Sequence, residues 1–385
     1  TKSIIMKKLE VFGAAKLKGQ VKISGSKNAS LPILAATLLS NKKISLTNIP
    51  RVKDVETMIK LLESMGSKVK VLKNKNSLII KNDKIIKAEA SYDLMSTMRA
   101  GIIVLGPLLA RFGKARASIP GGCNLGFRPI DIHLEALKKM GVKYKLVDGY
   151  INAKAKNGLV GAKIKFPKIS VGATENLMIA ACLAKGQTVL SNCAIEPEIK
   201  DLSNFLCSIG AKIVWTGRRQ VKIIGIKTFK QSNYKIMFDR IEAGTMLVAA
   251  AVNQGNLKLT GIETDILKTE INVLKKIGAK IIQKKNEIII QGNKKIKNIN
   301  IKTSPYPGFP TDLQSQLMVL LCKANKKSTI KEDIFANRFQ SVSELKRMDA
   351  KIEVKGNQAI IEGNTIFKGA QVMATDLRAS ASLVL

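Results

Sequence analysis

The sequence predicts an α/β protein of two domains, in which buried helices are enclosed by strands. Two observations lead to this class. The chain has 385 residues, enough for two domains that each bury a core of their own. It also repeats one pattern along its length: an apolar helix, a short strand, an amphipathic helix and two alternating strands. Since a helix that is apolar on all sides is buried, the helices are expected inside and the strands outside.

A short phrase marks the repeat: Met or Ile, then Gly, one variable residue and Lys, at the end of an amphipathic segment. The intervals between successive copies are 75, 69, 68 and 71 residues. Each Gly is expected at a left-handed helix C-cap, a conformation that glycine adopts at little cost. The positions are Gly66, Gly141, Gly210 and Gly278, with Asp349 in the same place of a fifth copy.

Hydrophobic periodicity assigns the elements of each copy. Apolar runs at 31–40 and 175–184 predict buried helices, and runs at 55–66 and 270–278 have the spacing of amphipathic helices. Short β-rich runs predict single strands, and longer alternating runs with a polar turn predict strand pairs. The single strands are expected at 43–49, 188–194 and 257–263, and the strand pairs at 68–81 and 280–292.

The domain boundaries follow from the repeat. Residues 1–20 read as strands without their helix and are expected to complete the second domain. The predicted domains are therefore 21–229, and 1–20 together with 230–385. A sixth copy begins at 375 and stops at Leu385 inside an expected buried helix. We expect the sequence to be a fragment that lacks its last few tens of residues.

The composition limits the classes of function. The formal net charge is +37, but the aromatic content is only 4%. The basic residues, mostly lysine, are spread along the chain, whereas nucleic-acid surfaces cluster charge and add aromatics. A solvated lysine surface is therefore favoured over a nucleic-acid-binding repeat protein, which remains the alternative from another class. The charge would still attract anionic substrates.

Histidine and cysteine usage argues against metal or redox chemistry. The chain has five cysteines without metal-ligand spacing and one histidine, His133. We therefore expect no metal and no cofactor. We expect no signal peptide, and no apolar run is long enough to span a bilayer. A cytoplasmic enzyme, monomeric or weakly homo-oligomeric, with small-molecule substrates fits these features.

One copy of the repeat is longer than the others. From the short strand to the closing Gly it spans 26 residues, against 21 or 22 in three other copies. The additional residues fall in a loop that contains Gly121, Gly122, Cys123 and Arg128. Adjacent glycines give the backbone freedom next to the thiol, and a nearby arginine can lower its pKa or bind an anion. We interpret the loop as a lid whose thiol takes part in chemistry; the alternative is a flexible loop with an incidental cysteine.

Arginine is rare, with eleven residues, so its positions are informative. Four of them occupy equivalent junctions near the starts of copies or in loops, where guanidinium groups suit phosphate and carboxylate; they are Arg99, Arg128, Arg338 and Arg378. Lys27 opens a helix after a Gly/Ser turn, which suits an anion at a helix N-terminus. Asp312 is either a helix N-cap or a base that faces a hydroxyl.

At these residues the chain resembles the enolpyruvyl transferase family that acts on UDP-N-acetylglucosamine. The resemblance extends from end to end and is carried by segments 23–36, 97–113, 120–133, 170–181, 196–202, 239–245, 306–316, 337–339 and 375–385. It is most specific in Pro-Gly-Gly-Cys at 120–123 and Phe-Pro-Thr-Asp at 309–312. It implies a two-domain inverse α/β barrel, or α/β prism, with three repeat units per domain and an active site between them. Shikimate 3-phosphate, the acceptor of the sister enzymes, is the close alternative.

The resemblance implies a role for individual residues. Cys123 is expected to donate a proton, with a covalent adduct to phosphoenolpyruvate or a part in product release as the alternative roles of its thiol. Asp312 is expected to act as base towards the sugar 3-hydroxyl, and Lys27 and Arg378 to act with them in catalysis. The residues implied in substrate binding are Lys27, Asn28, Arg99, Arg128, Pro129, Ile130, Asp131, Ile132, Lys168, Ile169, Ser170, Val171, Gly172, Asp312, Ile334 and Arg338. The implied substrates are phosphoenolpyruvate and UDP-N-acetylglucosamine, and the implied reaction is the first committed step of peptidoglycan synthesis.

The chain departs from the family pattern in two places. The last family motif, with a further anion-binding arginine, would lie beyond Leu385. Gly101 stands where the family more often has Ser. The first departure puts complete phosphoenolpyruvate binding in question, and the second alters the neighbourhood of Arg99.

Overall fold

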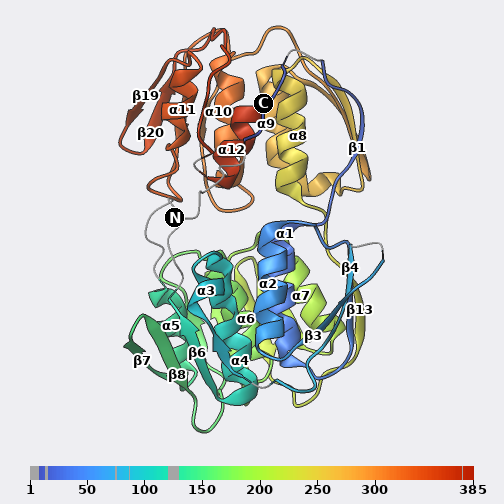
Figure 1. The fold of residues 1–385 in the computed structure, drawn as a ribbon, viewed down its shortest axis with the longest axis vertical. Coiled ribbons are helices and arrows are strands. Elements are labelled where there is room, and N and C mark those ends of the chain that lie inside the picture. Colours follow the sequence, from blue (N-terminus) through green and yellow to red (C-terminus); the bar gives the residue numbers. More distant parts are fainter. Residues whose placement is uncertain (1–7, 14–15, 74–75, 86, 120–129, 375) are drawn as a thin grey trace, which may run out of the picture. The chain divides into compact units, whose positions relative to one another are not determined.

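The computed structural model describes residues 8–13, 16–73, 76–85, 87–119, 130–374 and 376–385. The chain forms two compact units (Figure 1). Unit 1 takes in the described residues up to Lys22, together with Ile241–Ser304 and Phe309–Leu385. Unit 2 takes in the described part of Ile23–Arg240, together with Pro305–Gly308.

Unit 2 contains three four-stranded sheets of one plan among its described residues. In each, a strand from elsewhere in the chain runs parallel to a short strand, which pairs in turn with one arm of an antiparallel hairpin. The first sheet has the order β13 (Ser232–Lys235), β2 (Ile44–Thr47), β4 (Ser77–Lys81), β3 (Lys68–Val71). The second has the order β5 (Glu89–Ala90), β6 (Lys114–Ser118), β8 (Tyr150–Lys154), β7 (Lys143–Val147). The third has the order β9 (Lys163–Lys165), β10 (Gln187–Ser191), β12 (Gln220–Ile224), β11 (Lys212–Gly217).

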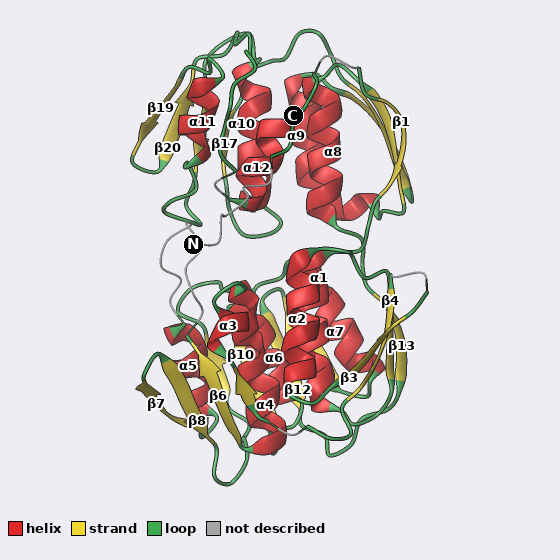
Figure 2. Ribbon diagram, in the orientation of Figure 1, coloured by secondary structure: helices red, strands yellow, loops and turns green. Residues whose placement is uncertain are grey.

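The helices of unit 2 lie inside these sheets, as Figure 2 shows. Helix α6 is buried from Ala173 to Ala181, and α1 from Ala29 to Ala36, because both are apolar on almost every side. The helical elements are α1 (Lys27–Ala36), η1 (Thr37–Leu39), α2 (Lys53–Ser64), α3 (Tyr92–Met95), η2 (Arg99–Val104), α4 (Leu105–Phe112), α5 (Asp131–Lys139), α6 (Val171–Ala181) and α7 (Pro197–Ser208).

Unit 1 contains two sheets of the same plan in its described part. One has the order β1 (Lys18–Lys22), β14 (Asn256–Thr260), β16 (Glu287–Gln291), β15 (Lys280–Lys284). The other has the order β17 (Asn300–Lys302), β18 (Ser328–Lys331), β20 (Gln358–Ile361), β19 (Ile352–Lys355). The helical elements are α8 (Arg240–Val252), η3 (Thr264–Leu267), α9 (Lys268–Ile277), η4 (Thr311–Leu313), α10 (Gln314–Cys322), α11 (Ser341–Arg347) and α12 (Leu377–Val384).

The predicted α/β class, with helices inside and strands outside, is confirmed, and so are the predicted C-caps. The φ angles of the four glycines of the repeat phrase are all positive, between 92° and 111°, and Asp349 has a φ of 71°. The repeat phrase therefore marks the same left-handed turn after an amphipathic helix in all five copies.

Three details differ from the sequence predictions. Unit 2 continues to Arg240 rather than ending at residue 229, because β13 pairs with β2. It also takes Pro305–Gly308 from within the sequence of unit 1. Finally, α12 was expected to be buried, but only Ala379 and Ser382 of this helix are.

Candidate active site

Lys27 is held at both ends at the start of α1. Its backbone N–H donates to Asp239 Oδ2 at 3.0 Å, and its ammonium lies 3.0 Å from Asp54 Oδ2. Ser26 caps the helix, because its Oγ accepts a hydrogen bond from Ala29 N at 3.2 Å. Two backbone donors of this helix end therefore already have acceptors inside the protein. The ammonium of Lys27, which has two further hydrogens, is the group that can bind an anion.

The backbone before α1 is fixed by pairing with residues 237–239. Ser26 N donates to Met237 O and Asp239 N donates to Ser24 O, both at 2.8 Å. A side chain at Gly25 would bring its Cβ within 1.6 Å of Asn48 O. The turn therefore requires glycine, and this requirement explains the residue before Ser26 in the predicted motif.

The two segments expected at the nucleotide lie at the N-terminal ends of helices. Ile130 precedes α5, and Asp131 and Ile132 form its first turn. Lys168 and Ile169 lead to Ser170, which caps α6 by accepting a hydrogen bond from Ala173 N at 3.3 Å. A hollow of about 170 Å³ lies between α5 and the end of β9. Its lining includes Asp131, Ile132, Phe166 and Pro167.

His133 is the residue of this region that sequence reasoning did not place. It is buried, and its Nδ1 lies 3.1 Å from the side-chain nitrogen of Asn176. Asn176 Oδ1 accepts a hydrogen bond from Gly106 N, which turns the amide NH₂ towards the imidazole. A Cβ at Gly172 would lie 3.5 Å from His133 Nε2. The imidazole thus packs against the start of α6 with Nδ1 as acceptor and Nε2 as the protonated nitrogen.

Burial also determines the charge of this imidazole. It lowers the pKa of His133 from 6.5 to about 4, because desolvation disfavours the charged ring. His133 is therefore neutral near pH 7. The sequence signal that could have located it is its position one residue after segment 130–132.

Asp312 lies between two guanidinium groups in unit 1. Arg338 donates to Asp312 Oδ1 and Arg378 donates to Oδ2, each at 3.1 Å. Arg338 is almost completely buried, whereas Asp312 keeps about a quarter of its side chain exposed. Neither η4 nor α10 has a side-chain cap, so the N-cap interpretation of Asp312 is wrong.

Ile334 lies in the turn after β18, where its backbone N donates to Glu332 Oε1 at 2.7 Å. Asn28 is the second residue of α1, and Val171 and Gly172 begin α6. Arg99 begins η2, but its side chain lies outside the described part of the structure. Cys123, Arg128 and Pro129 lie outside the described residues as well.

A second buried polar group in unit 2 was also not foreseen. Glu198 accepts two hydrogen bonds from Arg240 Nε, at 2.9 and 3.2 Å. Glu196 Oε1 accepts from Tyr306 N at 3.2 Å, and Arg219 donates to Tyr306 O at 2.9 Å. These bonds fasten the segment Pro305–Gly308, which directly precedes Phe309–Asp312 in the sequence.

Glu175 lies near the same carboxylates. Burial raises the pKa of the Glu175 carboxyl well above its ordinary value, and repulsion from Glu198 and Glu196 adds to this effect. Glu175 is therefore held towards its neutral form, which limits the repulsion among the three acids.

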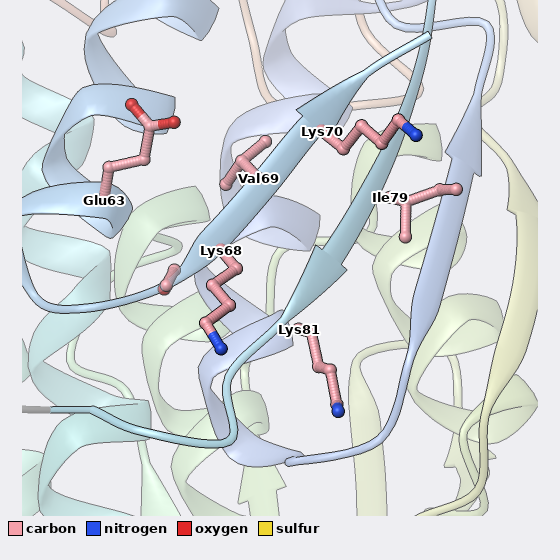
Figure 3. A pocket seen from close by; sticks show the side chains of 7 residues that line it. Glu63, Lys68, Val69, Lys70, Ile79 and Lys81 are labelled. Atoms are coloured by element: carbon pink, nitrogen blue, oxygen red, sulfur yellow. The ribbon is translucent and has the colours of Figure 1, made fainter.

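A larger hollow, of about 560 Å³, lies at α2, β3 and β4 of unit 2 (Figure 3). It is lined by Glu63, Ser67, Lys68, Val69, Lys70, Ile79 and Lys81, none of which is a predicted site residue. Lys68 and Lys81 form exposed ion pairs with Asp83. This hollow is an open lysine-rich face of β3 and β4.

The described residues contain no group of three or more His, Cys, Asp and Glu side chains that could hold a metal ion. None of the helices in the described ranges combines the length and the apolar character needed to cross a lipid bilayer.

Comparison with known proteins defines the class. The family model described as EPSP synthase (3-phosphoshikimate 1-carboxyvinyltransferase) matches residues 11–385. Since this match spans nearly the whole chain, the chain belongs to the EPSP synthase family of enolpyruvyl transferases.

Within that family, the chain groups with the UDP-N-acetylglucosamine 1-carboxyvinyltransferases. The enzyme of that name from Pelagibacter ubique (strain HTCC1062) is 70% identical over 380 residues, which are 99% of this chain and 91% of the relative. The one from Geotalea uraniireducens (strain Rf4) is 49% identical over 382 residues, which are 99% of this chain and 90% of that relative.

Solved structures agree on the fold. The enolpyruvyl transferase NikO from Streptomyces tendae superposes with a TM-score of 0.87 at 20% identity, covering 97% of this chain and 89% of that one. EPSP synthase from Acinetobacter baumannii superposes with a TM-score of 0.74 at 17% identity, with the same coverage. At these identities the likeness shows the fold alone.

Proposed function

We propose that the chain transfers the enolpyruvyl group of phosphoenolpyruvate to the 3-hydroxyl of UDP-N-acetylglucosamine and releases phosphate. The observation that carries this proposal is the 70% identity, over 99% of the chain, to an enzyme named for the transfer. The reaction is the first committed step of peptidoglycan synthesis, and we place it in the cytoplasm. The proposed partners are the two small-molecule substrates, and the proposed assembly is a monomer or a weak homo-oligomer.

The proposed reaction is an addition followed by an elimination. Lys27, Arg128 and Arg378 hold the phosphate and carboxylate of phosphoenolpyruvate. The thiol of Cys123 gives a proton to the methylene carbon while Asp312 takes the proton of the sugar hydroxyl. The hydroxyl oxygen then forms a bond to C2, and a tetrahedral phospho-ketal results.

Elimination reverses the proton movement at carbon. The C2–O bond to phosphate breaks, a proton leaves the methyl carbon for the thiolate, and the double bond is restored. A general acid and a general base of this kind each contribute roughly 10²–10⁴ in rate. Orientation of the substrates and neutralisation of their charge supply much of the remainder.

The environment of Asp312 supports its role as base. Both oxygens are oriented by guanidinium donors at 3.1 Å, so the carboxylate is aimed before substrate binds. Arg378 uses one of five N–H donors for this contact, which leaves others for a substrate carboxylate or phosphate. The ammonium of Lys27, fixed by Asp54, is a second prepared anion contact.

The proposal is tested by phosphate release from phosphoenolpyruvate. Wild-type protein is expected to release phosphate when UDP-N-acetylglucosamine is added, and not when shikimate 3-phosphate replaces it. Release with shikimate 3-phosphate alone would contradict the proposed acceptor. Cys123→Ser and Asp312→Asn are each expected to lower kcat by about 10²–10⁴-fold without unfolding the protein.

A matched control is Cys207→Ser. Cys207 is a free and exposed thiol in α7, without a proposed role, so this variant is expected to keep wild-type turnover. Normal turnover by Cys123→Ser would show that the thiol is not the proton donor.

A further inference from the structure

Glu332 is a buried carboxylate at the end of β18 that the proposed chemistry does not use. The residue is 3% exposed. Oε1 accepts hydrogen bonds from the backbone N–H groups of Ile334 and Phe335, at 2.7 and 3.1 Å. Oε2 accepts one from the hydroxyl of Thr311 at 2.8 Å. Both oxygens are therefore engaged by donors from two different loops.

These two loops contain Asp312 and Ile334, the unit 1 residues that we propose to contact UDP-N-acetylglucosamine. Thr311 directly precedes Asp312 in η4, and the turn after β18 continues from Ile334 to Arg338. Arg338 in turn donates to Asp312 Oδ1. The two loops are thus joined twice, once through Glu332 and Thr311 and once through Arg338 and Asp312, and together these bonds form a closed ring.

Hydrogen bonds are what stabilise this buried charge. No Lys or Arg side chain in the described part of the chain forms an ion pair with Glu332, whose neighbours are two amides and a hydroxyl. A buried carboxylate without a cation depends on such donors, and charge-assisted bonds are short and directional. Both loops therefore hold the Glu332 carboxylate in place, and the carboxylate in turn holds the two loops together.

We infer that Glu332 is a positioning residue for the transfer reaction. It fixes the peptide before Asp312 against the turn that contains Ile334, so that the base and the nucleotide-side backbone keep one relative placement. This inference rests on the proposed function for the roles of Asp312 and Ile334. The residue itself does not touch substrate.

The decisive variant is Thr311→Val, which keeps the shape of the side chain and removes only the bond to Glu332 Oε2. Because Asp312 acts on the hydroxyl as the proton leaves, its misplacement is expected to lower kcat while KM for UDP-N-acetylglucosamine stays within about twofold. The loss of one hydrogen bond to a charged group corresponds to a fall in kcat of about 10-fold. Thr311→Ser keeps the hydroxyl and is expected to restore kcat.

Glu332→Ala removes all three bonds and is expected to lower kcat and to raise KM for UDP-N-acetylglucosamine as well. Asp333→Ala is the matched control, because the carboxylate of this neighbour pairs with Lys302 and Asn357 and not with Thr311, Ile334 or Phe335. It is expected to behave as wild type. Since Glu332→Ala can fail to fold, the conclusion depends on the Thr311 pair, whose substitutions remove at most one bond.

A second measurement does not depend on activity. Hydrogen exchange, followed by mass spectrometry, is expected to be faster in Thr311→Val than in wild type at residues 311–316 and 334–336. Unchanged exchange together with unchanged kcat would overturn the inference, and so would equal kcat losses in Thr311→Val and Thr311→Ser. A wild-type protein without phosphate release would overturn the proposed function instead, while faster exchange in Thr311→Val would still support the link.

Discussion

At the scale of single residues, His133 makes the stability of the folded protein depend on pH, and the sign of this dependence follows from its pKa. The ring is neutral in the folded protein because burial lowers its pKa from 6.5 to about 4. Between these values the unfolded chain binds more protons than the folded one, so stability rises with pH across this window and is lost as pH falls through it. The shift corresponds to about 3 kcal/mol in the free energy of unfolding.

His133→Asn tests this directly. The difference in free energy of unfolding between wild type and variant, from urea melts at pH 4 and pH 6.5, is expected to grow by about 3 kcal/mol as pH rises. Other titrating groups, including Glu175, are present in both proteins and cancel in the difference. A difference that does not change with pH would show that the imidazole is not held neutral.

Single residues were predictable only where a motif carried them. Lys27, Asp312 and Arg338 belong to sequence blocks that resemble a family and have an implied role there. Asp54 belongs to no such block, His133 lies at the end of one without an implied role, and Glu332 again lies outside the blocks. Their roles arise from partners 27, 43 and 21 residues away that the fold brings into contact. Neither periodicity nor composition contains that information.

At the scale of elements, the last strand of a repeat ends against the inner helix of the same copy. Gly225 follows β12, and a Cβ there would lie 1.7 Å from Ala184 O, just beyond α6. Gly292 and Gly363 meet Ala250 O and Ala324 O in the same way, each at 2.4 Å. Only glycine allows a strand end to approach a helix backbone this closely.

Gly225→Ala is therefore expected to destabilise the protein by more than about 3 kcal/mol, because backbone must move to admit the methyl group. Gly141→Ala is the comparison. At Gly141 the φ angle is 92° but no atom lies within 4 Å, so only the conformational cost of about 1–2 kcal/mol applies. Chemical denaturation measures both, and equal losses in the two variants would contradict the close-approach argument.

Elements with a strong period were predictable, and elements defined by distant pairing were not. The runs at 68–81 and 280–292 form β3 with β4 and β15 with β16. They were predictable because the alternation of apolar and polar side chains lies within each run itself. Strand β13 has only four residues and owes its existence to pairing with β2, 188 positions earlier in the register from Ser232 to Ile44.

At the scale of the whole molecule, the net charge of +37 bears on the proposed substrates, which are both anions. A positive surface attracts anionic ligands over distances that salt shortens, since the Debye length falls from about 10 Å at 0.1 M to about 3 Å at 1 M. We expect kcat/KM for phosphoenolpyruvate to fall about 10-fold between 0.05 and 0.5 M KCl, with a smaller change in kcat.

Steady-state kinetics at constant viscosity measure this effect, with sucrose as a neutral solute control. A value of kcat/KM that is constant or rises with KCl would mean that the lysines act only as a solvated surface and do not draw substrate to the site.

The whole fold was predictable to the extent that it repeats. Five copies of one phrase predicted five helices with left-handed ends, and the helices that are apolar on all sides predicted strands outside them. The resemblance added the grouping of the copies into a two-domain inverse barrel. The inclusion of Pro305–Gly308 in unit 2 had no local signal. It depends on Arg219 and Glu196, which bind the backbone of Tyr306. Because backbone contacts require no particular side chain, the residue type at position 306 does not indicate them.

The inclusion of Pro305–Gly308 in unit 2 also affects the order in which contacts can form during translation. Tyr306 follows Arg219 by 87 residues and Glu196 by 110. At about 5–20 residues per second, a ribosome needs roughly 4–17 s to extend the nascent chain from Arg219 to Tyr306. During this interval the N-terminal half can collapse, but Arg219 and Glu196 cannot form their hydrogen bonds to the backbone of Tyr306 until that residue has been translated.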